Sequence, residues 1–333
     1  MQKSGKTILL VLSVVAVGIT AGIAMRSGTR DLRTEGLKQL RSGDTVKGTE
    51  LLEQHLKTDP SDHLVRKQLA ENYARQRKTQ QSATHLLYLS NEKETAEEAL
   101  RSLAAMALNT GDNLLAEQAL KKLLAISPTD FAANLALGEL YFNSGRATDS
   151  IPWIEACIKS QPERAASYLL LADALSDAGR TQEMIRPLET CIQLKPDQLA
   201  AHANLAYAYY SAGRSDEAIA EAQWCLKVQP DLHRVRLILA QAQRDKGLFD
   251  ESYENIQTVV QAEPSHLDAV LLESDLLFYR GEGKLVYDKL LPFFDAHPND
   301  RRLVSHLMRG AASNGDREVA KKWQKILADL IPK

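Results

Sequence analysis

The residues able to do chemistry are three cysteines, eight histidines and one glycine-rich turn. Cys157, Cys191 and Cys225 are equally spaced along the chain, and the sequence holds no Cys-x-x-Cys pair. The histidines show no His-Glu-x-x-His pattern, and the GEGK segment at 281–284 lacks the spacing of a phosphate-binding loop. A Gly-x-Ser-x-Gly elbow is also absent. The sequence therefore predicts a protein that is not an enzyme, with no catalytic, cofactor or metal site.

Prolines and glycines recur through most of the chain with the same spacing as the cysteines. Prolines keep it at Pro60, Pro128, Pro162, Pro196, Pro230, Pro264, Pro298 and Pro332. Glycines keep it at Gly43, Gly111, Gly145, Gly179, Gly213, Gly247, Gly281 and Gly315. A fixed period of this length indicates a solenoid, in which each repeat buries its apolar face only by stacking on its neighbours.

One repeat carries a recognisable signature. Leu137, Gly138 and Tyr141 match the L-G-x-x-Y core of the tetratricopeptide repeat, and Pro162 stands at its closing position. The chain resembles the tetratricopeptide-repeat family over residues 29–333. The resemblance implies an all-α, right-handed superhelical solenoid of about nine helix-turn-helix repeats. We number them one to nine from their expected first residues, Thr29, His63, Glu97, Phe131, Ala165, Leu199, His233, Leu267 and Arg301.

Each repeat is expected to hold a first helix, a turn at the glycine and a second helix that ends before the proline. Seven of the eight residues that follow the proline position are good N-cap types. These eight residues are Ser61, Thr95, Thr129, Glu163, Asp197, Asp231, Ser265 and Asn299. Repeat two is irregular, with Arg77 at the glycine position and Glu94 at the proline position. Pro187 and Pro292 predict kinks or opened turns in second helices, whereas Pro152 lies near a helix start and is tolerated there.

The three cysteines occupy a position where the tetratricopeptide pattern takes a small residue. Stacked repeats place equivalent atoms about 10 Å apart, the spacing of packed helices. A disulfide needs Cα atoms within roughly 7 Å of each other. We therefore expect Cys157, Cys191 and Cys225 to be buried and unlinked core residues.

The N-terminal residues 1–28 are interpreted as a signal anchor. An uncharged run from Thr7 to Met25 follows Lys3 and Lys6. At about 1.5 Å per residue, this run makes roughly 28 Å of helix, enough to cross a bilayer core of about 30 Å. The alternative is a cleaved signal peptide, for which Gly22 and Ala24 offer small residues at a cleavage site. We favour the anchor because the run exceeds the roughly 7–15 residues of a signal-peptide core.

The side of the membrane is harder to predict. Two lysines precede the span, and five basic residues follow it: Arg26, Arg30, Arg33, Lys38 and Arg41. This asymmetry favours a cytoplasmic body, but long domains translocate largely regardless of charge. A cytoplasmic body would also require export of a short tail that carries two lysines. We expect a single-pass anchor with an extracytoplasmic, periplasmic repeat body.

By the resemblance, first helices line a concave surface through repeat positions 2, 5, 6, 9, 12 and 13. In repeats one to three, this projection is basic, with Arg30, Arg33, Arg41, Lys67, Arg75 and Arg101 against Glu71 and Glu98. In repeats four to eight, it is acidic and aromatic, with Glu139, Phe142, Asn143, Asp173, Asp177, Asn204, Tyr207, Tyr210, Asp275, Phe278 and Tyr279. Aromatic rings beside adaptable polar groups suit a peptide-binding groove. The alternative is a solvated helix face.

The formal net charge of -2 gives no overall basic field, so no nucleic-acid partner is expected. The function predicted is a non-enzymatic scaffold that recruits or assembles proteins or peptides at a membrane through its groove. The layout is similar to that of bacterial envelope repeat proteins. Two alternatives remain open, a component of carbohydrate export and a regulatory subunit of a membrane enzyme complex.

Overall fold

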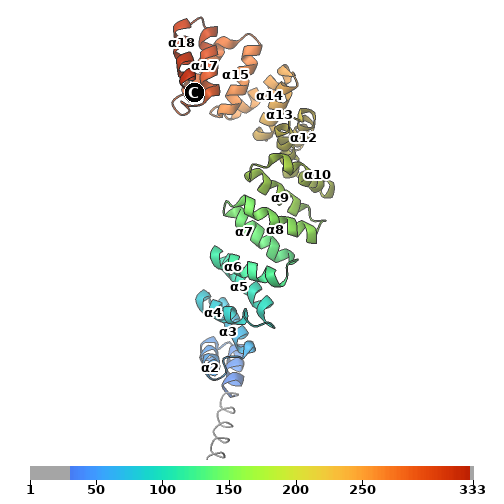
Figure 1. Ribbon diagram of the computed structural model, residues 1–333, viewed down its shortest axis with the longest axis vertical. Coiled ribbons are helices and arrows are strands. Elements are labelled where there is room, and N and C mark those ends of the chain that lie inside the picture. The colour runs from blue at the N-terminus through green and yellow to red at the C-terminus, as the bar shows by residue number, and fades with distance from the viewer. Residues whose placement is uncertain (1–30, 331–333) are drawn as a thin grey trace, which may run out of the picture. The chain divides into compact units, whose positions relative to one another are not determined.

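The computed structural model describes residues 31–330, in which all regular secondary structure is helical (Figure 1). The all-α prediction is confirmed for these residues. Their contacts divide the chain into two compact units, which are described separately. The N-terminal unit comprises Met1–Ser144, and the C-terminal unit comprises Gly145–Lys333. The predicted anchor, residues 7–25, lies outside the described residues. Between residues 31 and 330, no helix combines the length and the apolar character needed to cross a bilayer.

The N-terminal unit contains the helices of repeats one to three and the first helix of repeat four. Residues 31–42 are helical. They are followed by α2 (Thr45–Thr58), α3 (His63–Arg75), α4 (Thr79–Leu89), α5 (Ala96–Thr110), α6 (Asn113–Ile126) and α7 (Phe131–Asn143). Helices adjacent in sequence pack as antiparallel hairpins, with α3 against α4 and α5 against α6.

The C-terminal unit continues the same alternation. Its α-helices are α8 (Ala147–Ser160), α9 (Ala165–Asp177), α10 (Ile185–Leu194), α11 (Leu199–Ser211), α12 (Ser215–Val228), α13 (His233–Asp245), α14 (Phe249–Ala262), α15 (Leu267–Tyr279), α16 (Val286–Leu290), α17 (Arg301–Ser313) and α18 (Arg317–Asp329). Three short 3-10 helices interrupt the pattern: η1 (Thr181–Met184), η2 (Gly283–Leu285) and η3 (Leu291–Phe293).

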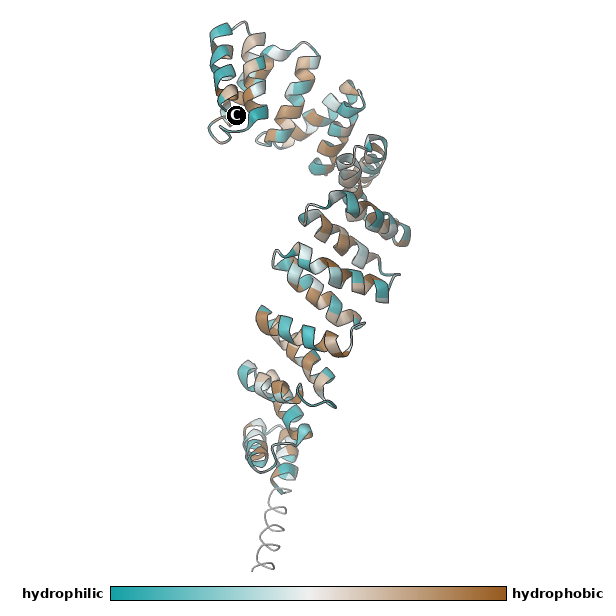
Figure 2. Ribbon diagram, viewed as in Figure 1, coloured by the Kyte–Doolittle hydropathy of each residue, from teal (hydrophilic) through white to brown (hydrophobic). Residues whose placement is uncertain are grey.

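The core consists of clusters shared by neighbouring helices. Leu52 of α2 packs with Leu69 of α3, and Leu237, Ile256 and Leu272 join α13, α14 and α15. Figure 2 shows brown hydrophobic residues and teal hydrophilic residues on the same helices, the amphipathic pattern that such stacking requires. Each unit is therefore stabilised by contacts between successive helices, as in a tetratricopeptide solenoid.

The turn between the two helices of a repeat has a left-handed backbone conformation, which favours glycine. Gly111 and Gly247 have φ of 74° and 78° there. Repeat two has Arg77 at this position, and its φ is 59°. The turn geometry therefore survives without glycine, although a side chain with a Cβ is strained in this conformation.

The N-cap prediction was wrong by one residue at most first helices. Asp62, Asp130 and Asp300 accept hydrogen bonds from Val65 N, Ala133 N and Leu303 N respectively. Ser61, Thr129 and Asn299 lie one residue earlier, because the proline and the residue after it form the turn that precedes the cap. Thr95 is the N-cap of α5, but its hydroxyl donates to Leu89 O instead of capping the helix.

The expected proline effects are present. α8 continues unbroken through Pro152. In repeat five, η1 precedes α10, which contains Pro187. In repeat eight, Pro292 lies within η3, and the second helix is reduced to the short α16 between two 3-10 segments. The missing N–H and the ring clash of an interior proline account for these opened turns.

The cysteine prediction is confirmed, since Cys157, Cys191 and Cys225 are free and fully buried. Burial raises the pKa of the Cys191 thiol, and it raises the pKa of the Cys225 thiol to about 12. Both thiols therefore stay protonated and behave as small apolar side chains.

Candidate functional site

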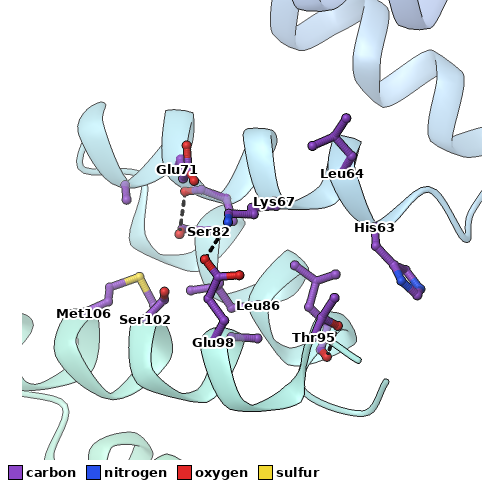
Figure 3. Close-up of a pocket in the computed structure, with 14 residues that line it drawn as sticks. His63, Leu64, Lys67, Glu71, Ser82, Leu86, Thr95, Glu98, Ser102 and Met106 are labelled. Atoms are coloured by element: carbon purple, nitrogen blue, oxygen red, sulfur yellow. Dashed lines mark hydrogen bonds and ion pairs between the residues drawn. The ribbon is translucent and has the colours of Figure 1, made fainter. Parts of the chain in front are cut away.

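An apolar groove lies in the N-terminal unit where α3, α4 and α5 meet (Figure 3). Its volume is about 430 Å³. Apolar side chains line most of it: Leu64, Ala70, Ala74, Leu86, Leu89, Ala99 and Met106. Leu64 is 48% exposed, whereas Ala70, Leu89 and Ala99 are buried. The groove thus has a solvent-facing apolar wall over a packed floor, the type of surface that binds ligands or partners.

A small residue of α3 lies in the lining of this groove. Ala74 occupies position 12 of repeat two. Repeats four, six and eight have an aromatic ring at the same position: Phe142, Tyr210 and Phe278. A methyl group occupies less of the space between α3 and α5 than a ring would, so Ala74 contributes to the hollow.

An ion pair crosses the rim of the groove. Lys67 Nζ of α3 lies 2.5 Å from Glu98 Oε1 of α5, and Figure 3 shows the two side chains pointing toward each other. This hydrogen bond to Glu98 raises the pKa of Lys67. Glu71, one turn further along α3, lies 3.6 Å from the exposed Arg75 of the same helix. Lys67, Glu71 and Glu98 together give the groove lining one net negative charge.

Polar groups at the floor are satisfied by the protein itself. The Ser82 hydroxyl donates to Ala70 O at 2.8 Å, and the Thr95 hydroxyl donates to Leu89 O at 2.7 Å. An apolar ligand would therefore not strand these groups when it displaces water from the floor.

Three residues expected to bind partners lie on α7. Glu139 and Asn143 are exposed, and Phe142 is half-buried. They belong to the N-terminal unit but do not line the groove around Ala74.

Three further expected residues come from α9 and α11 of the C-terminal unit. Asn204 Nδ2 donates to Asp173 Oδ1 at 2.8 Å. Burial raises the pKa of Asp173, the Asn204 amide opposes this shift, and the nearby negative charge of Asp177 adds to it. Asp177 is exposed. Asp173 is therefore held in place by a neighbouring first helix.

The expected tyrosines Tyr207 and Tyr210 are both half-buried on α11. Tyr207 lines a cavity of about 340 Å³ between α11 and α13, and the Arg234 guanidinium lies 5.8 Å from its ring centre. Burial raises the pKa of Tyr210, as does the charge of Asp245, while Arg244 opposes the shift. Both rings are thus in contact with charged residues of α13.

Asp275 is surrounded by cations. His306 Nε2 lies 2.8 Å from its carboxylate, and Arg309 and Arg244 lie 3.5 Å and 3.7 Å away. Burial alone would raise the pKa of Asp275, but the hydrogen bond from His306 and the three positive charges keep it below its usual value. His306 Nδ1 also lies 2.7 Å from Arg302 O, so both ring nitrogens lie beside oxygen atoms.

The remaining two expected residues are aromatic. The Arg309 guanidinium lies over the Phe278 ring at 3.9 Å from its centre. Tyr279 packs against Phe249 with ring centres 3.9 Å apart and is 65% exposed. Phe278 therefore belongs to a packed cluster, whereas Tyr279 presents much of its surface to solvent.

The structure adds detail to the predicted charge of these faces. Arg244, His306 and Arg309 of repeats seven and nine neutralise the carboxylate of repeat eight, so this part of the surface is not simply acidic. In repeats two and three, where basic residues were predicted with Glu71 and Glu98 against them, the first helices also line an apolar groove. Position 12, where repeat two has Ala74 and repeats four, six and eight have a ring, is the sequence feature that bears on the groove.

A family model described as tetratricopeptide repeat matches four overlapping stretches, residues 106–162, 135–188, 169–228 and 203–266. This part of the chain is therefore similar to tetratricopeptide repeats. Proteins built from such repeats generally mediate protein–protein interactions. A search of curated proteins gives no match.

Two solved structures with TM-scores of 0.50 or more support the fold. A tetratricopeptide repeat protein from Parabacteroides merdae has a TM-score of 0.53 at 17% identity, over 70% of this chain and 96% of its own. YrrB, described as having an unusual peptide-binding site, has a TM-score of 0.50 at 14% identity, over 56% of this chain and 95% of its own. MamA also matches, at a TM-score of 0.46 and 24% identity, over 50% of this chain and 92% of its own.

Proposed function

We propose that this protein is a non-enzymatic scaffold that binds a segment of a partner protein in the groove around Ala74. The observation that carries the proposal is the groove itself, about 430 Å³ of mostly apolar surface with an ion pair at its rim. Its size suits a few side chains of a peptide. The peptide-binding site named for YrrB, a protein of the same fold, supports this use of a repeat surface.

The side chains of the groove suit binding better than reaction chemistry. The Ser82 hydroxyl is engaged with a backbone carbonyl, and the Lys67 ammonium is engaged with Glu98. His63, at the edge of the groove, lies 4.0 Å from Glu92. Among the described residues of the groove, no nucleophile lies beside a base in the arrangement that acyl transfer or hydrolysis needs.

The scaffold is further proposed to act at a membrane. Residues 7–25 would anchor it, with the repeats on the extracytoplasmic side. The length and apolar character of this segment support the anchor. The candidate residues on α9, α11 and α15, from Asp173 to Tyr279, would form a second contact surface in the C-terminal unit.

Substitution of Ala74 by phenylalanine tests the groove, because the ring would fill the space that the methyl group leaves. Full-length protein in its native membrane would be crosslinked to its partner, and the partner recovered would be quantified by mass spectrometry. We expect Ala74→Phe to lower recovery about tenfold or more, since the centre of an interface carries most of the binding energy.

The matched control is Ala125→Phe, which adds the same ring to an exposed position on α6 outside the groove. It should leave recovery unchanged. Circular dichroism should show equal helicity in both variants. Unchanged recovery with Ala74→Phe would overturn the proposed function.

A further inference from the structure

Repeats eight and nine contain a closed cluster of an acid, a ring and a cation. Asp275 and Phe278 stand at positions 9 and 12 of repeat eight, and Arg309 stands at position 9 of repeat nine. The Arg309 guanidinium covers the Phe278 ring at 3.9 Å and lies 3.5 Å from the Asp275 carboxylate. The three side chains meet between the first helices α15 and α17.

The same three positions in repeats two and three hold Glu71, Ala74 and Ala105. The acid is kept, but the ring and the cation are both replaced by methyl groups. The groove lies where that ring would be, with Ala74 in its lining. The Glu71 side chain is 41% exposed, and its ion-pair partner Arg75 is 76% exposed. Surface pairs of this kind contribute little and exchange readily.

We infer that the groove binds a partner segment that carries a phenylalanine or tyrosine next to an arginine or lysine. This inference rests on the proposed function and names the chemistry of the partner. The ring would lie beside Ala74 against Leu86 and Met106, where thioether–aromatic contacts are favourable. The cation would pair with Glu71, in a lining that carries one net negative charge.

The volume is sufficient for this occupant. An apolar cavity of about 150 Å³ accommodates a benzene ring, and the groove measures about 430 Å³. The space left beside the ring can hold an adjoining side chain of the same segment. The partner segment would thus provide, in repeats two and three, the aromatic ring and the cation that Phe278 and Arg309 provide in repeats eight and nine.

The test measures binding of short capped peptides to the full-length protein in detergent by fluorescence anisotropy. A set of peptides places phenylalanine and arginine at different separations, from adjacent to one helical turn apart, and the tightest binder serves as the parent. Replacing its phenylalanine by alanine should weaken binding about tenfold or more. Replacing its arginine by glutamate should weaken binding more than replacement by glutamine.

A double-mutant cycle assigns the cation to Glu71. In Glu71→Gln protein, the preference for the arginine peptide over its glutamine analogue should shrink several-fold. Glu50→Gln, at an exposed position on α2 outside the groove, is the control and should leave that preference unchanged. An unchanged preference in Glu71→Gln, or equal binding of phenylalanine and alanine peptides, would overturn the inference.

A filled groove gives an independent check. Ala74→Phe with Ala105→Arg places the ring and cation of repeats eight and nine into repeats two and three. This variant should lose peptide binding and gain thermal stability. If Ala74→Phe blocks the native partner while no aromatic–basic peptide binds, the inference fails and the proposed function stands. If Ala74→Phe blocks neither the native partner nor the peptide, the groove is not the binding site.

Discussion

The face formed by α3 and α5 in the N-terminal unit and the face formed by α15 and α17 in the C-terminal unit share one register. They differ in what fills the space between the first helices. Between α15 and α17, Phe278 and Arg309 close that space with a ring and a guanidinium. Between α3 and α5, Ala74 leaves it open, and only the Lys67–Glu98 pair spans the rim. Side chains at matching repeat positions therefore occupy the space between first helices in one unit and line a groove in the other.

The two faces also differ in how their charges are used. In the C-terminal unit, Asp275 lies beside His306, Arg309 and Arg244, so its charge is paired within the protein. In the N-terminal unit, Glu71 has only an exposed neighbour on its own helix as an ion-pair partner, and it lines an open groove. A charge in the first setting stabilises a helix stack, whereas a charge in the second can contribute to recognition.

The largest effect is expected from opening the closed face. Phe278→Ala removes a half-buried ring from beneath Arg309. Loss of a fully buried ring costs roughly 3–5 kcal/mol, and we expect about half of that here. Chemical denaturation followed by circular dichroism would measure it. The variant should also bind a small aromatic such as indole weakly. If it does not bind indole, removal of the ring does not produce a groove, and the comparison between the two faces is wrong.

The N-terminal unit should respond to acid through His85. This buried ring stacks on Tyr73 with centres 5.7 Å apart, its Nε2 lies 3.1 Å from Glu53, and its Nδ1 has no hydrogen-bond partner in the described structure. Burial lowers the pKa of His85 from 6.5, although the Glu53 carboxylate opposes the shift. The folded protein therefore binds this proton less readily than the unfolded chain does.

The sign of the pH dependence follows from that difference. The stability that depends on neutral His85 is present above pH 6.5 and is lost as the pH falls below that value toward the lowered folded pKa. Denaturation of the wild type at a series of pH values should show this loss. His85→Gln should flatten the pH dependence, and an unchanged profile in this variant would show that other groups cause it.

The smallest effect concerns the turn of repeat two. Arg77 adopts φ of 59°, a conformation that other repeats reserve for glycine. Arg77→Gly should relieve strain of about 1–2 kcal/mol, offset in part by the greater freedom of glycine in the unfolded chain. A net gain of roughly 0.5–1 kcal/mol is expected from thermal denaturation. Gly247→Ala, the reverse change in the C-terminal unit, should destabilise by a similar amount.

Much of the fold could be predicted from the repeat interval alone. Glycines that recur in every repeat but the second predict a left-handed turn at the same place each time, and Gly111 and Gly247 show it. An interior proline removes a backbone hydrogen bond and adds a ring clash, so the opened turns near Pro187 and Pro292 were also predictable. Cysteines with the period of the repeat share one environment, which accounts for their common burial.

The groove and the charge partners were decided only by the tertiary structure. The groove depends on side chains of three helices at once, and the sequence of α3 does not predict how far α5 lies from Ala74. The charge of Asp275 likewise depends on Arg244 of α13 and Arg309 of α17, which belong to the repeats before and after its own. The spacing of residues predicts the backbone conformation of each segment, because that conformation depends mainly on residues close together in the sequence. Whether neighbouring first helices are bridged or leave a groove depends on side-chain volumes and charges summed across helices, because packing is not local.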